Sequence, residues 1–309
     1  MAKKYMYFLN EERKKVNILK KIIPVLIIFF LLFTSFVVNR ISLKNTAVQS
    51  IVHDSDYLGT LQNEVFIAEE KRKQEEALLK AQQNRFRNLS SEELEMINHI
   101  YAHKEEKKVF LTFDDGPTSN ITPQILDILK RYNVKATFFV LGKQVERNPD
   151  LIKREFNEGH SIESHTYSHS YKTVYQSKDS FFDEFNRTEA ALQRTLNRSD
   201  FKTLVVRMPG GSVGGQYSAI KKEIGVELSN KGIASLDWNV LTKDAEGASQ
   251  YDEIINNVVT GTGNKHCAVV LMHDADTKQI TADTLPKVIE YYRDNGFKFE
   301  TIEDYIGRT

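Results

Sequence analysis

The chain has 309 residues, of which 40% are hydrophobic and 27% are charged, and its formal net charge at pH 7 is zero. Nine of the 42 basic residues but only two of the 42 acidic residues lie within residues 1–44, so the rest of the chain is acidic. An acidic body lacks the basic surface that nucleic-acid binding requires, which argues against that class of partner. The length is sufficient for one large core with additional segments.

The N-terminal segment is the first predicted element. Ile22–Val38 is an uncharged apolar run of 17 residues, and seven basic residues precede it. As a helix this run would reach about 25 Å, close to the lower limit for a membrane span. We interpret it as an uncleaved transmembrane signal anchor of a single-pass cell-membrane protein, with residues 1–21 in the cytoplasm and the body outside. A cleaved signal peptide and a buried core helix are the alternatives.

Residues 39–106 form a polar connection, which we interpret as a stalk or linker. Leu61–Leu89 is rich in Glu, Lys, Gln and Ala, which predicts a solvated helix. Ser90 and Glu93 have the spacing of a capping box, and this predicts a second helix that ends near His103. A disordered linker is the alternative to a helical stalk.

The pattern changes at Lys107, and we expect one folded domain over residues 107–309. Short β-rich runs alternate there with helical patterns, which predicts an α/β fold of parallel strands and crossover helices. About seven strands predict a distorted, incomplete (β/α) barrel, with a doubly wound open sheet as the competing arrangement. The expected strands are Val109–Phe113, Ala136–Val140, His160–Ser164, Thr203–Val206, Gly232–Leu236, Ala268–Met272 and Phe297–Phe299. The expected helices lie near Thr122–Tyr132, Pro149–Glu158, Lys178–Asn197, Tyr217–Asn230, Tyr251–Thr260 and Thr281–Asn295.

Chemically reactive side chains come directly after several of these strands. In a parallel barrel the carboxyl ends of all strands share one face, and that face holds the active site. We therefore expect residues that are far apart in the sequence to converge there. They are Asp114 and Asp115 after the first strand, His165 and His169 after the third, Arg207 after the fourth, Asp244 a few residues past the fifth, and His273 after the sixth.

A metal site is the first chemistry that this cluster predicts. His165 and His169 are four residues apart, so they can face the same way on one helical turn. Together with Asp115 they offer two imidazoles and one carboxylate, a three-ligand set that suits a catalytic Zn²⁺ with one open position. The same spacing recurs in His99 and His103, which we interpret as a solvated helix face.

Four short motifs resemble those of the polysaccharide deacetylases, the carbohydrate esterase family that removes acetyl groups from N-acetylglucosamine polymers. The resemblance covers about Lys107–Ile306, and the anchor and stalk further resemble surface-bound peptidoglycan N-acetylglucosamine deacetylases of Gram-positive bacteria. Taken alone, the first motif would also fit an ordinary turn. The motifs are Thr112–Pro117 (TFDDGP), His165–His169 (HTYSH), Arg207–Pro209 (RMP) and Leu271–His273 (LMH), in the family's order.

The resemblance implies which residues hold the metal and which one is the base. Asp115, His165 and His169 would hold Zn²⁺ or a similar ion such as Co²⁺ or Mn²⁺. That ion would lower the pKa of its bound water and polarise the acetyl carbonyl. Asp114 would be the general base, held and charge-paired by Arg207.

The resemblance also implies an acid and an oxyanion donor. His273 would protonate the leaving amine, and Asp244 would orient it and raise its pKa. The backbone N–H of Gly210, which follows Pro209, would stabilise the oxyanion, and Leu271 would line the pocket for the acetyl methyl. The implied partner is a cell-surface polysaccharide, with peptidoglycan as the first choice, and the sequence predicts no oligomeric state.

Two stretches depart from the family's pattern. The family commonly has R-P-P-Y where this chain has Met208 and Gly210, and it often ends a W-x-x-D-x-x-D-W motif with Trp where this chain has Ala245. The aromatic walls of the sugar site are therefore expected to be missing, which would weaken stacking on a sugar. In the second stretch Asp237 is the alternative to Asp244 as the partner of the general acid.

Other functions compete with this interpretation. Gly210–Gly214 (GGSVG) fits the G-x-S-x-G motif of serine hydrolases, and Ser212, Asp244 and His273 occur in the order expected of α/β-hydrolases. We interpret this match as accidental, because it leaves the three metal-ligand residues without a role. The remaining alternatives are deacetylation of another surface N-acetylglucosamine polymer, hydrolysis of O-acetyl esters, and a catalytically weak wall-binding module.

Overall fold

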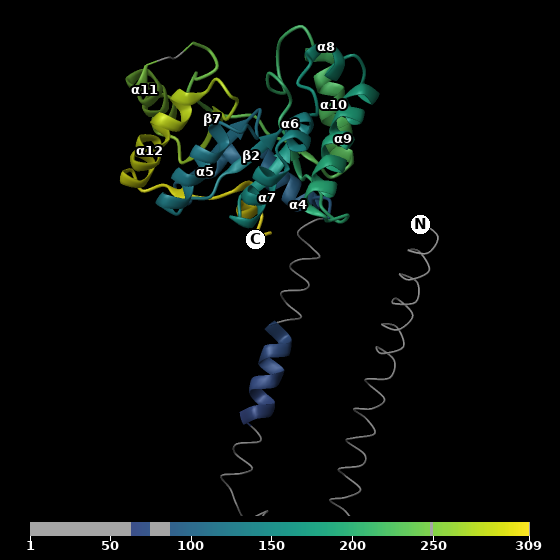
Figure 1. The fold of residues 1–309 in the computed structure, drawn as a ribbon, viewed down its shortest axis with the longest axis vertical. Coiled ribbons are helices and arrows are strands. Elements are labelled where there is room, and N and C mark those ends of the chain that lie inside the picture. The colour runs from purple at the N-terminus through teal and green to yellow at the C-terminus, as the bar shows by residue number, and fades with distance from the viewer. Residues whose placement is uncertain (1–62, 75–86, 248–249, 309) are drawn as a thin grey trace, which may run out of the picture. The chain divides into compact units, whose positions relative to one another are not determined.

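The computed structural model describes residues 63–74, 87–247 and 250–308. They belong to two compact units, Met1–Ala77 and Leu78–Thr309. In the first unit residues 63–74 are helical, and all elements named below belong to the second unit (Figure 1). No helix among the described residues combines the length and the apolar character that a membrane span needs, and the predicted anchor Ile22–Val38 lies outside them.

The described part of the second unit is built around one sheet of eight parallel strands. Its order is β5-β4-β3-β2-β1-β7-β6, with β8 also paired to β1. This is the circular order of a barrel that stays open between β5 and β6, whereas a doubly wound sheet would reverse its order near the middle. The predicted incomplete α/β barrel is therefore confirmed. The strands are β1 (Lys108–Asp114), β2 (Thr137–Val140), β3 (Ser161–Ser164), β4 (Val205–Val206), β5 (Ala234–Ser235), β6 (Val240–Leu241), β7 (Cys267–His273) and β8 (Lys298–Phe299).

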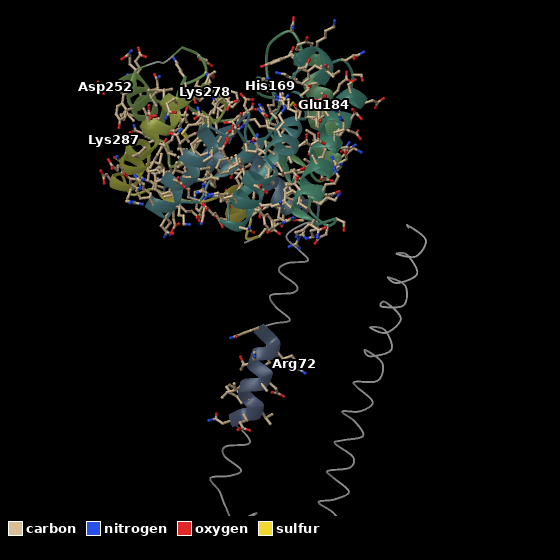
Figure 2. All side chains as sticks on the ribbon, viewed as in Figure 1. Arg72, His169, Glu184, Asp252, Lys278 and Lys287 are labelled. Atoms are coloured by element: carbon tan, nitrogen blue, oxygen red, sulfur yellow. The ribbon has the colours of Figure 1, made fainter. Side chains whose placement is uncertain are left out.

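The six expected helices are all present and surround the strands. Figure 1 shows α11, α12 and α5 on the left of the sheet and α9 and α10 on the right. Charged side chains such as Asp252 on α11 and Lys287 on α12 lie on the outer, solvent-exposed surface (Figure 2). The bounds are α5 (Ile121–Tyr132), α7 (Pro149–Asn157), α9 (Lys178–Leu196), α10 (Ser218–Asn230), α11 (Tyr251–Thr262) and α12 (Gln279–Asp294), and the shorter helices are α6 (Gly142–Arg147), α8 (Tyr171–Val174) and α13 (Ile302–Tyr305).

Strand β1 shows how the sheet separates its two faces. Val109, Leu111 and Phe113 pack in the cluster that joins the strands to α5, α7, α11 and α12. Phe110 packs in a second cluster with residues of the other strands. Because successive side chains of a strand point to opposite faces, Asp114 lies on the same inner face as Phe110, at the carboxyl end of β1.

The segment before β1 packs on the barrel instead of continuing the predicted stalk to residue 106. It contains α4 (Ser91–Asn98) and a 3₁₀ turn, η1 (Ile100–Ala102), so the helix expected to end near His103 ends earlier. Ile97 and Ile100 are fully buried, and they pack with Phe110 and residues at the start of β7. The compact unit accordingly begins before Lys107, because these apolar side chains close the amino-terminal end of the barrel.

An ion pair fastens this segment to the end of the chain. Arg308 donates two hydrogen bonds to the Glu93 carboxylate, at 2.6 and 2.8 Å, and the Ser90 amide donates a third at 2.6 Å. Burial alone would raise the pKa of Glu93, but the hydrogen bonds from Arg308 and Ser90 lower it to about 2. The carboxylate therefore stabilises the fold at neutral pH.

We predict that Glu93→Gln lowers the free energy of unfolding at pH 7 by about 2 kcal/mol, because the ion pairs of Glu93 with Arg308 and Arg87 lose the carboxylate charge. The contribution of Glu93 is fully present above the pKa of an unfolded glutamate, 4.5, and is lost as pH falls towards about 2. Urea denaturation at pH 7 and pH 4 measures both effects. The exposed neighbour Glu92→Gln is the control, and equal stabilities of the two variants at pH 7 would contradict the prediction.

Candidate active site

The predicted site residues meet at the carboxyl ends of the strands. Asp114 ends β1 and His273 ends β7, and the two are register partners in the sheet. His165 follows β3 and Arg207 follows β4. A pocket of about 310 Å³ opens beside them. Its lining includes Asp114, Asp115, His165, His169, Tyr171, Gly210, Trp238, Asp244, Leu271 and His273.

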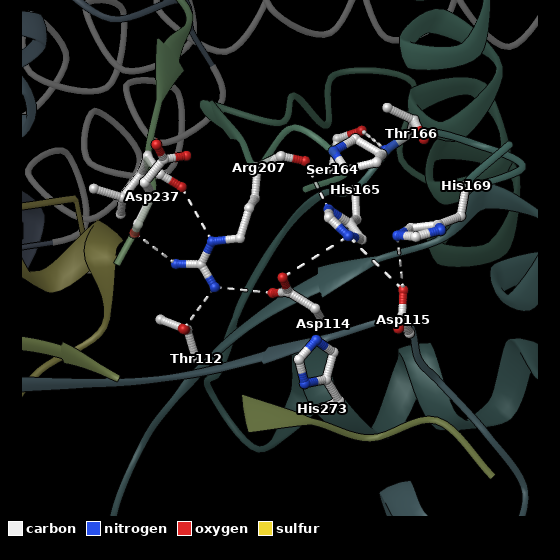
Figure 3. A network of polar contacts seen from close by, with 12 residues as sticks. Thr112, Asp114, Asp115, Ser164, His165, Thr166, His169, Arg207, Asp237 and His273 are labelled. Atoms are coloured by element: carbon white, nitrogen blue, oxygen red, sulfur yellow. Dashed lines mark hydrogen bonds and ion pairs between the residues drawn. The ribbon is translucent and has the colours of Figure 1, made fainter. Parts of the chain in front are cut away.

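Arg207 is fully buried and holds Asp114 in place (Figure 3). Its guanidinium donates to Asp114 Oδ1 at 2.9 Å and to Thr112 Oγ1 at 2.7 Å. The remaining N–H groups donate to the backbone carbonyls of Leu236 and Asp237, each at 3.0 Å. A buried guanidinium with four partners keeps the Asp114 carboxylate oriented.

Asp115, His165 and His169 are the one group of three ligand side chains that the described residues offer to a metal ion. Asp115 Oδ1 lies 3.6 Å from His169 Nε2 and 3.8 Å from His165 Nε2, and as a buried oxygen it has no hydrogen-bond partner. A buried carboxylate oxygen that faces two imidazole nitrogens without a proton-mediated contact fits a cation between them. The predicted three residues are thus brought together, and their donor set fits a zinc-like ion.

The two imidazoles are prepared to act as ligands. His165 Nδ1 lies 2.6 Å from the carbonyl oxygen of Arg207, which can only accept a hydrogen bond. Nδ1 therefore carries the proton, and in the neutral ring Nε2 presents a lone pair to Asp115. Burial, and then the neighbouring His165, lower the pKa of His169, so its neutral form is favoured at neutral pH.

His273 contacts Asp244 and not Asp237. Its Nδ1 lies 2.9 Å from Asp244 Oδ1, and its backbone N–H donates to Oδ2 at 2.8 Å. Burial alone would lower the pKa of His273, but the hydrogen bond and charge of Asp244 raise it to about 9. Burial alone would raise the pKa of Asp244, but the hydrogen bonds from His273 and Thr281 hold it below its usual value. This pair keeps an imidazolium beside the pocket at neutral pH.

Ser212, in the Gly210–Gly214 loop, does not take part in the His273–Asp244 pair. Ser212 donates its hydroxyl to Asp237 Oδ2 at 2.7 Å and its backbone N–H to Oδ1 at 2.8 Å. His273 pairs with Asp244 instead, so the described structure does not assemble a triad of Ser212, Asp244 and His273. Asp237 fixes the loop that follows Gly210. The serine of the GGSVG stretch is therefore a structural contact of this loop.

The peptide between Pro209 and Gly210 is oriented by a tyrosine that sequence reasoning missed. Tyr175 donates its hydroxyl to the Pro209 carbonyl at 2.7 Å. In a trans peptide the carbonyl oxygen and the N–H point in opposite directions, so this contact turns the Gly210 N–H away from Tyr175. Gly210 lines the pocket, and its φ of +72° is readily available to glycine.

An aromatic wall is present, although not at the positions that the sequence comparison suggested. Tyr171 lines the pocket next to Gly210, and its ring lies 5.5 Å from that of His169. A Cβ on Gly210 would come within 2.5 Å of the Tyr171 hydroxyl, so this tyrosine fills the space of a side chain at position 210. Trp238 lines the same pocket. The expectation that the pocket lacks aromatic walls is therefore corrected, although positions 210 and 245 themselves carry no aromatic residue. The Tyr-x-x-x-Tyr spacing of Tyr171 and Tyr175, on one helical turn, was the sequence feature that could have indicated these tyrosines.

Comparison with known proteins agrees with the motifs. The polysaccharide deacetylase family model matches residues 101–229. A peptidoglycan-N-acetylglucosamine deacetylase of Listeria monocytogenes is 35% identical over 66% of this chain and 40% of its own length. A peptidoglycan-N-acetylglucosamine deacetylase of Bacillus cereus is 32% identical over 65% of this chain and 71% of its own length.

The fold is also similar to that of a solved structure. A Streptococcus mutans CE4 esterase superposes with a TM-score of 0.62 at 32% identity, covering 69% of this chain and 92% of that one. The chain spans only 40% of the length of the Listeria relative.

We predict that Asp244→Asn lowers the pKa of His273 from about 9 towards the usual 6.5, because the imidazolium loses its charged partner while burial still opposes the charge. NMR titration of the His273 ring in wild type and variant measures the change. The exposed carboxylate of Asp276 provides the control, Asp276→Asn, which leaves the titration as it is. An unchanged His273 pKa in Asp244→Asn would contradict the pairing.

Proposed function

The chain belongs to the polysaccharide deacetylase family, and we propose that it hydrolyses the N-acetyl groups of N-acetylglucosamine residues in peptidoglycan. The observation that carries the proposal is the convergence of three kinds of group on one pocket. These are a carboxylate fixed by a buried arginine, Asp114, a predicted ligand set that includes an unpartnered buried carboxylate oxygen, and a charged imidazole, His273.

The ligand set would hold Zn²⁺ or a similar divalent ion such as Co²⁺ or Mn²⁺. Asp115, His165 and His169 supply two neutral nitrogens and one carboxylate oxygen, which is the donor set that zinc accepts in catalytic sites. When bound, such an ion supplies Lewis-acid polarisation of an acyl oxygen and lowers the pKa of water.

The other residues divide the proton transfers between a base and an acid. Asp114, oriented by its ion pair with Arg207, accepts the proton of the attacking water. His273, kept protonated by Asp244, donates a proton to the leaving amine. His273 therefore rests in the protonation state that its step requires.

The walls of the pocket position the acetyl group and its oxyanion. The Gly210 N–H supplies a backbone donor for the developing negative charge, with the peptide orientation set by Tyr175 through Pro209. Leu271 is buried and lines the pocket, where it offers an apolar contact to the acetyl methyl. Water is the only nucleophile in this scheme, so no acyl-enzyme forms.

Peptidoglycan is the proposed substrate because the relatives named above are peptidoglycan-N-acetylglucosamine deacetylases. Tyr171 and Trp238 add aromatic surface on which a sugar ring can stack. Other surface N-acetylglucosamine polymers and O-acetyl esters are the alternative substrates. A cell-surface substrate also agrees with the proposal that Ile22–Val38 anchors the chain in the cell membrane with its catalytic domain outside.

We predict that the 309-residue chain releases acetate from peptidoglycan, that EDTA abolishes this activity and that Zn²⁺ restores it. His169→Ala removes a ligand and should lower kcat/KM by about 10³-fold, whereas the exposed His99→Ala should leave it unchanged. Acetate is measured in parallel on peptidoglycan, chitin-like oligomers and acetylated xylan, which ranks the substrates.

Three results would contradict parts of this proposal. Full activity of His169→Ala, or of the wild-type chain in EDTA, would contradict the metal-dependent mechanism. Complete loss of activity in a folded Ser212→Ala would favour the serine-hydrolase mechanism instead. Peptidoglycan binding by the Zn²⁺-loaded chain without acetate release would favour a wall-binding module.

We predict that Tyr175→Phe lowers kcat about tenfold and leaves KM within about twofold, because the peptide that carries the Gly210 N–H loses its orienting contact. Tyr292→Phe is the matched control, since it also removes one hydrogen bond of a buried tyrosine hydroxyl. That hydroxyl lies 2.7 Å from Thr262 Oγ1. Steady-state kinetics on acetylated oligomers measure both. Equal kcat values for the two variants would contradict the role of Tyr175.

A further inference from the structure

The loop between the two histidine ligands has an unfavourable backbone conformation. Thr166 has a φ of +69° and His169 a φ of +59°, and neither is a glycine. Residues in this left-handed conformation are strained, and they persist only where the surrounding structure holds them in place. The relative placement of the His165 and His169 rings therefore depends on contacts outside the ligand set.

Glu184 holds the amide side of this loop. Its Oε2 accepts the backbone N–H of Tyr167 at 3.1 Å and that of Ser168 at 2.6 Å. Glu184 lies on α9, 1% exposed, and Figure 2 labels it beside His169. Arg187, one turn further along α9, stacks over the Tyr167 ring with its Cζ 3.8 Å from the centroid. The Glu184 carboxylate therefore connects the middle of the loop to helix α9.

The start of α6 holds the carbonyl side of the same loop. The amides of Gly142 and Lys143 donate to the carbonyls of Thr166 and Tyr167 at 3.0 and 3.1 Å, and Lys143 Nζ donates to the carbonyl of Ser168 at 2.9 Å. A Cβ on Gly142 would come within 2.4 Å of the Tyr167 ring, which shows how closely α6 and the loop pack. All three peptide carbonyls between the histidines are thus occupied.

We propose that Glu184 is a positioning residue that sets the relative placement of the two histidine ligands and thereby the affinity of the metal site. It does not line the pocket and does not contact Asp114 or His273, so it acts through the backbone of the loop. Without its acceptor, the two part-buried amides of Tyr167 and Ser168 lose their partner and the left-handed residues relax. Metal binding must then restore the ligand geometry at the expense of affinity.

The experiment titrates the 309-residue chain with Zn²⁺ and records the absorption spectrum of the Co²⁺-loaded chain. Glu184→Ala should weaken Zn²⁺ binding by about 10- to 100-fold and alter the Co²⁺ bands, which report ligand geometry. Glu184→Gln retains a carbonyl acceptor and should bind within about threefold of wild type. The matched control is Glu189→Ala on the same helix, whose carboxylate pairs with Lys202 and should not affect metal binding.

Each outcome decides the proposal. Wild-type affinity and spectrum in a folded Glu184→Ala would overturn it. Equal losses in Glu184→Gln and Glu184→Ala would also overturn it, because they would assign the effect to the charge and not to the acceptor. If Glu184→Ala does not fold, Glu184→Asp carries the test, since it keeps the charge and withdraws the acceptor by one methylene. Weaker binding in Glu184→Asp would support the proposal, and unchanged binding would overturn it.

Discussion

The buried ion pair between Arg207 and Asp114 is the interaction on which the rest of the site depends. A guanidinium without solvent must find a hydrogen-bond acceptor for nearly every N–H, and Arg207 finds its acceptors on β1 and in the residues after β5. Its own carbonyl accepts the His165 proton. One residue therefore sets the direction of the proposed base and the tautomer of a proposed ligand, and it ties opposite parts of the barrel together at the point where the reaction is proposed.

The incomplete barrel explains where the pocket opens. β5 and β6 do not pair, so the barrel stays open between them, and non-strand residues connect β5 to β6 and follow β6. That stretch supplies Trp238, Asp244 and Ala245 to the pocket. On the closed side the register of β1 and β7 places Asp114 next to His273 without any loop between them. The fixed side thus carries the proposed base and acid, and the open side carries the wall that meets the substrate.

The sequence was informative wherever local pattern and chemistry coincide. Apolar runs located the long strands, and the motif residues after them met in space as a barrel requires. β6 was missed because two residues have no periodicity, and the packing of Ile97 and Ile100 was missed because their apolar partners lie on distant strands. The motif spacing favoured Asp244 and left Asp237 as the alternative, and the path of the chain beyond β6 shows that Asp244 contacts His273. Glu184 belongs to no motif, since its role depends entirely on where α9 packs.

Tyr171 and Gly210 come from different strand–helix connections yet share one volume, since the hydroxyl of the first lies where the Cβ of the second would be. Positions 171 and 210 therefore cannot vary independently. A side chain at 210 requires a smaller residue at 171 and also a change of the left-handed backbone at 210, so a single exchange at either position collides or leaves a gap. Among related chains these two positions should covary, and the pair, taken together, is the unit by which the shape of this wall can be changed.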